Sequence, residues 1–248
     1  MKIKLLVALL GLAKVLLGQS PDAVNLLALE KQAQLALHRG IHFFHSIAIK
    51  GGYVYYYTTD LKEKWGEGET DDFTIEVQPP GTPAVGLAFL RAYRTMPRPE
   101  FLQAAMDAAR ALIVGQNDLG GWDHKIFFQR KKRNLVSFDD DQTQSAIRFL
   151  MAMDQEIEND SLYRAIDSAL KMMLAAQFTN GAWPHLYPKQ GDYHDYATFN
   201  DRTINNCIEV MLDAHRYYHK PEFLESLKQA GHFLIISQLP PPQPGWAQ

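Results

Sequence analysis

Three segments of this chain repeat one pattern at a fixed interval. Each begins with bulky apolar residues, continues with apolar residues at helical spacing and ends on glutamine; the segments are residues 101–116, 162–177 and 223–238. The closing residues Gln116, Gln177 and Gln238 are 61 positions apart in both intervals, and a tryptophan follows each of them. A period of this length indicates a stack of similar supersecondary units.

The repeated unit is predicted to be a helical hairpin. Apolar residues within each copy follow the 3.6-residue period of an amphipathic helix. A second helical segment precedes each copy, at residues 83–93, 142–153 and 202–218. A further helix is expected at about residues 24–49, and residues 53–57 and 73–77 are expected to pair as a small β-hairpin.

The loops that follow the repeated turns are long, which favours a closed toroid over an open solenoid. The sequence stops after Gln248, where another hairpin is expected to begin. We therefore predict an all-α chain that forms an incomplete α/α toroid of successive helical hairpins.

Composition excludes several functional classes. The net charge of −3, without a strongly basic surface, gives no attraction for nucleic acid. The single cysteine, Cys207, excludes a disulfide framework and a cysteine zinc site.

The first 19 residues are typical of a signal peptide, with Lys2 and Lys4 before a short apolar run. An ordinary helix is the alternative, favoured by Lys14 and by a poor cleavage pattern. The run is too short to span a bilayer. We expect a secreted or periplasmic protein whose domain covers residues 20–248.

Two acidic clusters open the first helices of the second and third hairpins. They are Asp139-Asp140-Asp141 and Asn200-Asp201. Such residues cap helices by accepting hydrogen bonds from free backbone N–H groups. Clustered carboxylate and amide oxygens also suit a hard cation such as Ca²⁺. Both interpretations remain open, and the repeat places the two clusters at the same end of their hairpins.

Aromatic and basic residues occupy the loops at that end. Trp122, Trp183 and Tyr196 either plug the packing between helices or stack on the faces of sugar rings. The run from Arg130 to Arg133 is either a solvated surface or a contact for an anionic chain.

Six ordered strings carry a family resemblance, from about residue 53 to the end of the chain. They are Trp65-Gly66-Glu67-Gly68, residues 77–83 (VQPPGTP), residues 139–150 (DDDQTQSAIRFL), Gly181-Ala182-Trp183-Pro184, Thr198-Phe199-Asn200-Asp201 and Pro244-Gly245-Trp246-Ala247-Gln248. The sequence resembles the pectic acid lyase family, which comprises polysaccharide lyase family 10 and its bacterial relatives.

The resemblance implies an α/α toroid that cleaves polygalacturonate by Ca²⁺-assisted β-elimination. It implies that the metal is held by Asp201, Asn200, Asp140 and Asp141. The residues expected to contact the polysaccharide are Trp122, Trp183, Tyr196, Asp139, Arg130 and Arg133.

The sequence also departs from the family pattern. The resemblance implies a catalytic arginine from a segment beyond Gly245-Trp246-Ala247-Gln248, and Arg202 does not match that position. Ala182 and His185 stand where glycine and glutamine are common. We therefore assign no catalytic residue and expect a truncated member that binds better than it cleaves. A non-catalytic carbohydrate-binding or interaction module on the same hairpins is the alternative.

Overall fold

The chain divides into two units, residues 1–46 and residues 47–248. A computed structural model describes residues 21–247, so the expected signal peptide at residues 1–19 lies outside the described residues. In the first unit the described element is the helix α2 (Pro21–Ser46), which agrees with the helix expected at about residues 24–49. Between residues 21 and 247, no helix combines the length and the apolarity that crossing a membrane requires.

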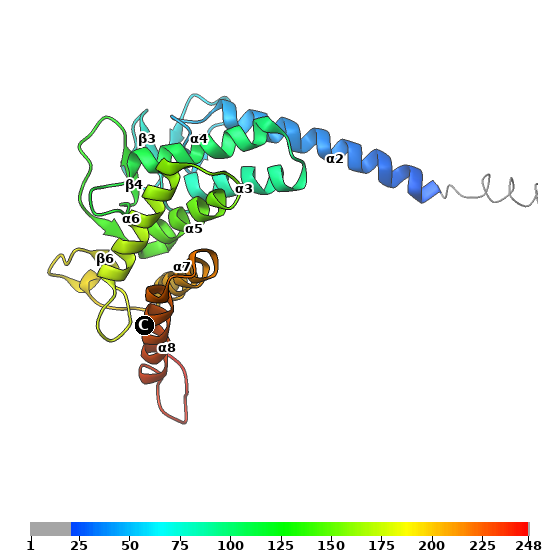
Figure 1. The fold of residues 1–248 in the computed structure, drawn as a ribbon. Coiled ribbons are helices and arrows are strands. Elements are labelled where there is room, and N and C mark those ends of the chain that lie inside the picture. The colour runs from blue at the N-terminus through cyan, green and yellow to red at the C-terminus, as the bar shows by residue number, and fades with distance from the viewer. Residues whose placement is uncertain (1–20, 248) are drawn as a thin grey trace, which may run out of the picture. The chain divides into compact units, whose positions relative to one another are not determined.

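Three successive helical hairpins dominate the described part of the second unit (Figure 1). They are α3 (Thr82–Thr95) with α4 (Pro99–Gly115), α5 (Gln142–Asp154) with α6 (Asp160–Ala176), and α7 (Thr203–Tyr218) with α8 (Pro221–Ile236). The first helices of the hairpins pack in order, α3 against α5 and α5 against α7. The predicted all-α class and the hairpin repeat are confirmed.

The repeated apolar pattern forms the buried face of α4 and α6, the second helices of the first two hairpins. In α6, Leu162, Ile166, Ala169 and Met173 are all buried, and the corresponding positions of α4 are buried too. Burial of each large aliphatic side chain contributes about 1.5–3 kcal/mol to the stability of the fold. Asn159 fixes the start of α6, because its side chain accepts hydrogen bonds from the N–H groups of the first turn.

The closing glutamines of the first two copies, Gln116 and Gln177, tie their turns to the next hairpin. The Nε2 atom of Gln116 donates to the backbone oxygen of Gly120 at 2.7 Å and to that of Ala165, on α6, at 2.8 Å. Gln177 makes the equivalent pair of bonds at 2.9 and 3.0 Å. These bonds explain why glutamine closes both the first and the second copy.

The described residues also form three two-stranded antiparallel pairs, from segments that precede the first hairpin or connect successive hairpins. They are β1 (Tyr56–Tyr57) with β2 (Lys64–Trp65), β3 (Thr74–Glu76) with β4 (Lys125–Phe127), and β5 (Val136–Ser137) with β6 (Leu186–Tyr187). The expected pairing of residues 53–57 with residues 73–77 is therefore wrong. Ile75 of β3 is fully buried and is the register partner of Ile126 on β4, so β4 covers the apolar residue of β3.

Candidate functional site

Two short 3₁₀ turns carry the acidic clusters into α5 and α7. They are η1 (Asp139–Asp141) and η3 (Asn200–Arg202). Asp140 has φ of 44° and Asp201 has φ of 48°, and the two residues are 61 positions apart. The left-handed region is uncommon for residues other than glycine, although aspartate tolerates it better than most. The repeat therefore places a strained aspartate at the same point of the second and third hairpins.

The N-cap positions of α5 and α7 make no side-chain capping bond. The N-cap residues are Asp141 for α5 and Arg202 for α7, and neither side chain accepts a hydrogen bond from its helix. Asp139 accepts a bond from the backbone N–H of Asp140, within the turn itself. The side chains at the N-cap positions of α5 and α7 therefore do not cap these helices.

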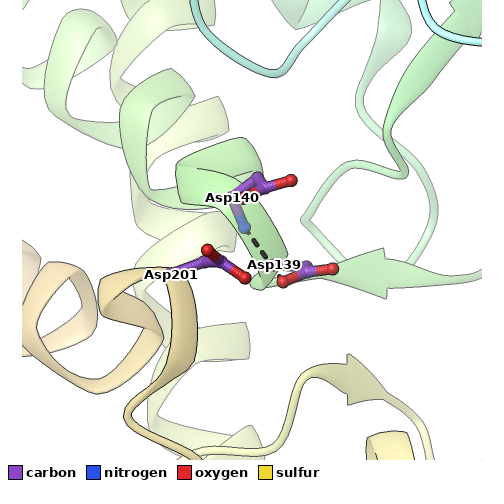
Figure 2. A group of neighbouring side chains, drawn as sticks. All are labelled: Asp139, Asp140 and Asp201. Carbon is purple, nitrogen blue, oxygen red and sulfur yellow. Dashed lines mark hydrogen bonds between the residues drawn. The ribbon is translucent and has the colours of Figure 1, made fainter.

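The two clusters meet at one end of the hairpins. Asp139, Asp140 and Asp201 each place a carboxylate oxygen within 4.8 Å of the others (Figure 2). Among residues 21–247, no lysine or arginine forms an ion pair with any of the three. Burial and then the charges of Asp139 and Asp201 raise the pKa of Asp140. A cation placed between these carboxylates would relieve that repulsion.

Asp141 and Asn200 lie differently from the other members of the predicted metal set. Both carboxylate oxygens of Asp141 accept bonds from Nη2 of Arg148, at 2.6 and 2.5 Å. Burial raises the pKa of Asp141 to about 6, and Arg148 opposes that shift. The side-chain amide of Asn200 donates to Asp201. The structure thus places Asp141 in an ion pair and Asn200 beside the carboxylate cluster.

A chain of ion pairs continues from Asp141 along the wall of the site. Arg148 also binds Glu209, which accepts a bond from Arg202 at 2.8 Å. Arg148 and Glu209 are 61 positions apart, so they occupy equivalent positions on α5 and α7. In this series of ion pairs the two arginines balance Asp141 and Glu209. The series therefore leaves the negative charge of Asp139, Asp140 and Asp201 uncompensated.

These residues line an open groove of about 500 Å³. Its lining residues are Gln78, Pro79, Asp140, Asp141, Arg148, Asp201, Arg202, Asn206 and Glu209. The sequence analysis missed Gln78, Asn206 and the Arg148–Glu209 pair. The opposite charges of Arg148 and Glu209 at equivalent repeat positions are a signal that could have identified that pair.

Trp122 and Trp183 are not on the surface. They are exposed by only 1% and 0%, and each Nε1 donates to a backbone oxygen of the preceding helix, Leu112 or Met173, at 2.9 Å. A sugar ring cannot reach an indole face in this position. The expected stacking on substrate is therefore wrong for both rings, and packing between helices accounts for them.

The other predicted contact residues lie outside the lining of the groove. Tyr196 is 72% exposed on its loop. Arg130 pairs with Glu69 and Asp71. Arg133 pairs with Asp123 at 3.0 Å, and both arginines line a second recess of about 320 Å³. The structure thus places Arg130 and Arg133 in the same recess, outside the lining of the groove that contains Asp140 and Asp201.

Residues 116–232 match the family model described as pectic acid lyase. The resemblance to the pectic acid lyase family is confirmed. The matched segment includes both acidic turns, the whole of α5, α6 and α7, and most of α8. No curated protein matches the chain by sequence.

Several solved structures share the fold of this pectic acid lyase-like chain. A cellobiose 2-epimerase from Spirochaeta thermophila is 15% identical, with a TM-score of 0.56 over 77% of this chain and 48% of that one. An unsaturated glucuronyl hydrolase from a Bacillus species is 11% identical, with a TM-score of 0.53 over 71% of this chain and 50% of that one. Both are α/α toroid enzymes, which confirms the predicted toroid architecture.

A variant of a family 10 polysaccharide lyase from Cellvibrio cellulosa, solved with trigalacturonic acid, is also similar. It is 19% identical, with a TM-score of 0.48 over 63% of this chain and 51% of that one. This chain spans about half the length of the enzymes it matches.

Proposed function

We propose that this chain binds polygalacturonate at the carboxylate groove and cleaves it by calcium-assisted β-elimination. The observation that carries the proposal is the convergence of Asp139, Asp140 and Asp201, from two hairpins, within 4.8 Å. The match of residues 116–232 to the pectic acid lyase family supports the choice of an acidic polysaccharide.

The three carboxylates fit a calcium ion. Calcium takes oxygen ligands at about 2.3–2.6 Å, so two oxygens on opposite sides of one ion are about 5 Å apart. The spacing of the cluster falls within this limit, and the donors are all oxygens. Asp139, Asp140 and Asp201 would hold the ion. When bound, it would supply positive charge beside a uronate carboxylate, where charge develops as the C5 proton leaves.

A positively charged side chain of the protein can also contact a uronate carboxylate in the groove. Arg202 follows Asp201 directly, lines the groove and keeps 67% of its side chain exposed despite its bond to Glu209. A guanidinium forms strong charge-assisted hydrogen bonds with carboxylates. We expect Arg202 to orient a uronate carboxylate, while the Asp141–Arg148–Glu209 chain fixes the wall of the groove.

A non-catalytic carbohydrate-binding module is the alternative function. Its support in the sequence is a rim of tryptophans together with the missing catalytic arginine segment, and two of those rings are buried. The carboxylate cluster needs no aromatic platform to recruit an anionic chain through calcium. The lyase is therefore the better supported proposal.

We also propose that the protein acts outside the cytoplasm, where polymeric pectate occurs. Its basic and apolar first residues are typical of a signal for export.

Calcium binding should weaken on acidification. Metal-binding carboxylates must lose their protons, and the raised pKa of Asp140 means that it accepts a proton at a higher pH than an ordinary aspartate. Below that pKa the affinity should fall about tenfold per pH unit for each proton displaced.

Calorimetric calcium titrations between about pH 7 and about pH 4.5, with and without trigalacturonate, test this expectation across the aspartate range. We expect trigalacturonate to bind only when calcium is present. An affinity for trigalacturonate that calcium does not change would contradict the proposed site.

A further inference from the structure

Asn206, in the first turns of α7, is a buried polar residue that lines the carboxylate groove. Asn206 is only 5% exposed, yet its side-chain amide makes no hydrogen bond with any group in residues 21–247. The amide is not sealed inside the protein, as the unbonded Oε1 atoms of Gln142 and Gln144 are. A buried amide without partners destabilises a fold, so a ligand in the groove would supply the partners that the protein does not.

The repeat shows that packing at this position does not require an amide. Ser145 lies 61 positions before Asn206, at the equivalent point of α5, and is 9% exposed. Its hydroxyl donates to the backbone oxygen of Gln142 at 3.0 Å, so the serine is satisfied by its own helix. Asparagine also has a low intrinsic preference for the interior of a helix. Neither packing nor helix formation therefore accounts for an open amide in the third hairpin.

The neighbours of Asn206 on α7 indicate which chemical group it would bind. Arg202, Asn206 and Glu209 are four and three residues apart, and all three line the groove. Arg202 donates to Glu209 at 2.8 Å, which leaves Asn206 as the neutral and unbonded member of the three. An amide offers an oxygen acceptor and two N–H donors, and a hydroxyl likewise both donates and accepts. Asn206 therefore suits the hydroxyls of a ligand, and Arg202 suits its carboxylate.

The spacing along α7 agrees with this division. An α-helix rises 1.5 Å per residue, so Asn206 is about 6 Å farther along the helix than Arg202. In a uronate ring the hydroxyls on C2 and C3 lie across the ring from the carboxylate on C5. A ring whose carboxylate meets Arg202 therefore extends these hydroxyls toward Asn206.

We propose that Asn206 is a specificity-determining residue that hydrogen-bonds the C2 and C3 hydroxyls of a galacturonate unit in the groove. This role rests on the proposed binding of polygalacturonate at the carboxylate groove. A unit whose C2 and C3 hydroxyls are missing or substituted leaves the amide buried and unpaired, and such a loss is how a polar site rejects a ligand.

Asn206→Ser tests the role, because serine already occupies the equivalent position of α5. Asn205→Ser is the matched control, since Asn205 is the same residue type at the next position of the same helix and is exposed. Asn206→Ala is a second variant that removes the polar group altogether. Each protein is titrated by calorimetry, in the presence of calcium, with trigalacturonate and with an analogue in which hydrogen replaces the C2 and C3 hydroxyls.

We expect the unaltered protein to bind the deoxy analogue about 10-fold more weakly than trigalacturonate, as the loss of one or two neutral hydrogen bonds requires. Asn206→Ser and Asn206→Ala should bind trigalacturonate about 10-fold more weakly and should no longer distinguish the two ligands. Their calcium affinity should stay unchanged and their melting temperatures should not fall, because the amide makes no bond within the protein. Asn205→Ser should behave as the unaltered protein with both ligands.

Several results would overturn the role of Asn206. Variants that still distinguish the two ligands as strongly as the unaltered protein would show that Asn206 does not contact these hydroxyls. A fall in calcium affinity would make Asn206 a metal ligand. Full affinity of both Asn206 variants for trigalacturonate would remove Asn206 from the binding site while leaving the proposed function intact. No calcium-dependent binding of trigalacturonate by the unaltered protein would overturn the proposed function, and the role of Asn206 with it.

Discussion

Asp140→Asn is expected to lower the calcium affinity of this protein by about 100-fold or more, because calcium affinity follows the number of charged ligands in the site. Asp140 is the member of the cluster whose carboxylate is crowded by both Asp139 and Asp201. Its replacement removes a negative charge and leaves a single neutral oxygen, a weaker ligand for calcium. Calorimetric titration with calcium measures the change, and polygalacturonate binding should fall in parallel.

The same substitution should not unfold the protein. The raised pKa of Asp140 shows that its charged form is disfavoured in the folded state, so neutral asparagine should leave stability unchanged or raise it. Asp72→Asn is the matched control, since the Asp72 side chain is 86% exposed and pairs only with Lys64 at 3.3 Å. Unchanged calcium affinity in Asp140→Asn would remove this aspartate from the proposed site.

Trp183→Ala is expected to destabilise the protein by about 3–5 kcal/mol, as is typical when a buried tryptophan is truncated. The ring is 0% exposed, and its Nε1 bond to the Met173 oxygen would be lost with it. Thermal or urea unfolding measures the change. The large effect should be on stability, because the ring is out of reach of a ligand.

Trp246→Ala is the control for this effect. Its Nε1 donates to the Leu234 oxygen at 2.9 Å, as Trp183 does to Met173, but Trp246 is 48% exposed. Its truncation should cost well below 3 kcal/mol, because less apolar area leaves water on folding. If Trp183→Phe kept full stability but lost calcium-dependent polysaccharide binding, a stacking role would replace the packing role.

The helical hairpins could be predicted because their signal is local. The spacing of Leu162, Ile166, Ala169 and Met173 defines a buried helical face without knowledge of any other segment. Strand pairing was not predictable in this way. β3 and β4 are about 50 residues apart in sequence, and the buried pair of Glu76 and Lys125 that aligns them depends on the packed structure.

Part of the site was predictable because the repeat is visible in the sequence itself. The 61-residue period alone assigns Asp140 and Asp201 to the same end of their hairpins. The sequence could not show that Asp141 turns to Arg148, because the left-handed backbone of these turns sets the direction of each carboxylate. It also could not separate a buried indole from an exposed one beside a glycine turn.

The direct test of the central claim is the ultraviolet absorbance of the unsaturated product, measured with polygalacturonate in the presence of calcium and then of a chelator. We predict an increase in absorbance that requires calcium, stops on chelation and is lost in Asp140→Asn but not in Asp72→Asn. Product formation that continues under chelation, or that Asp140→Asn leaves unchanged, would contradict calcium-assisted cleavage at this groove.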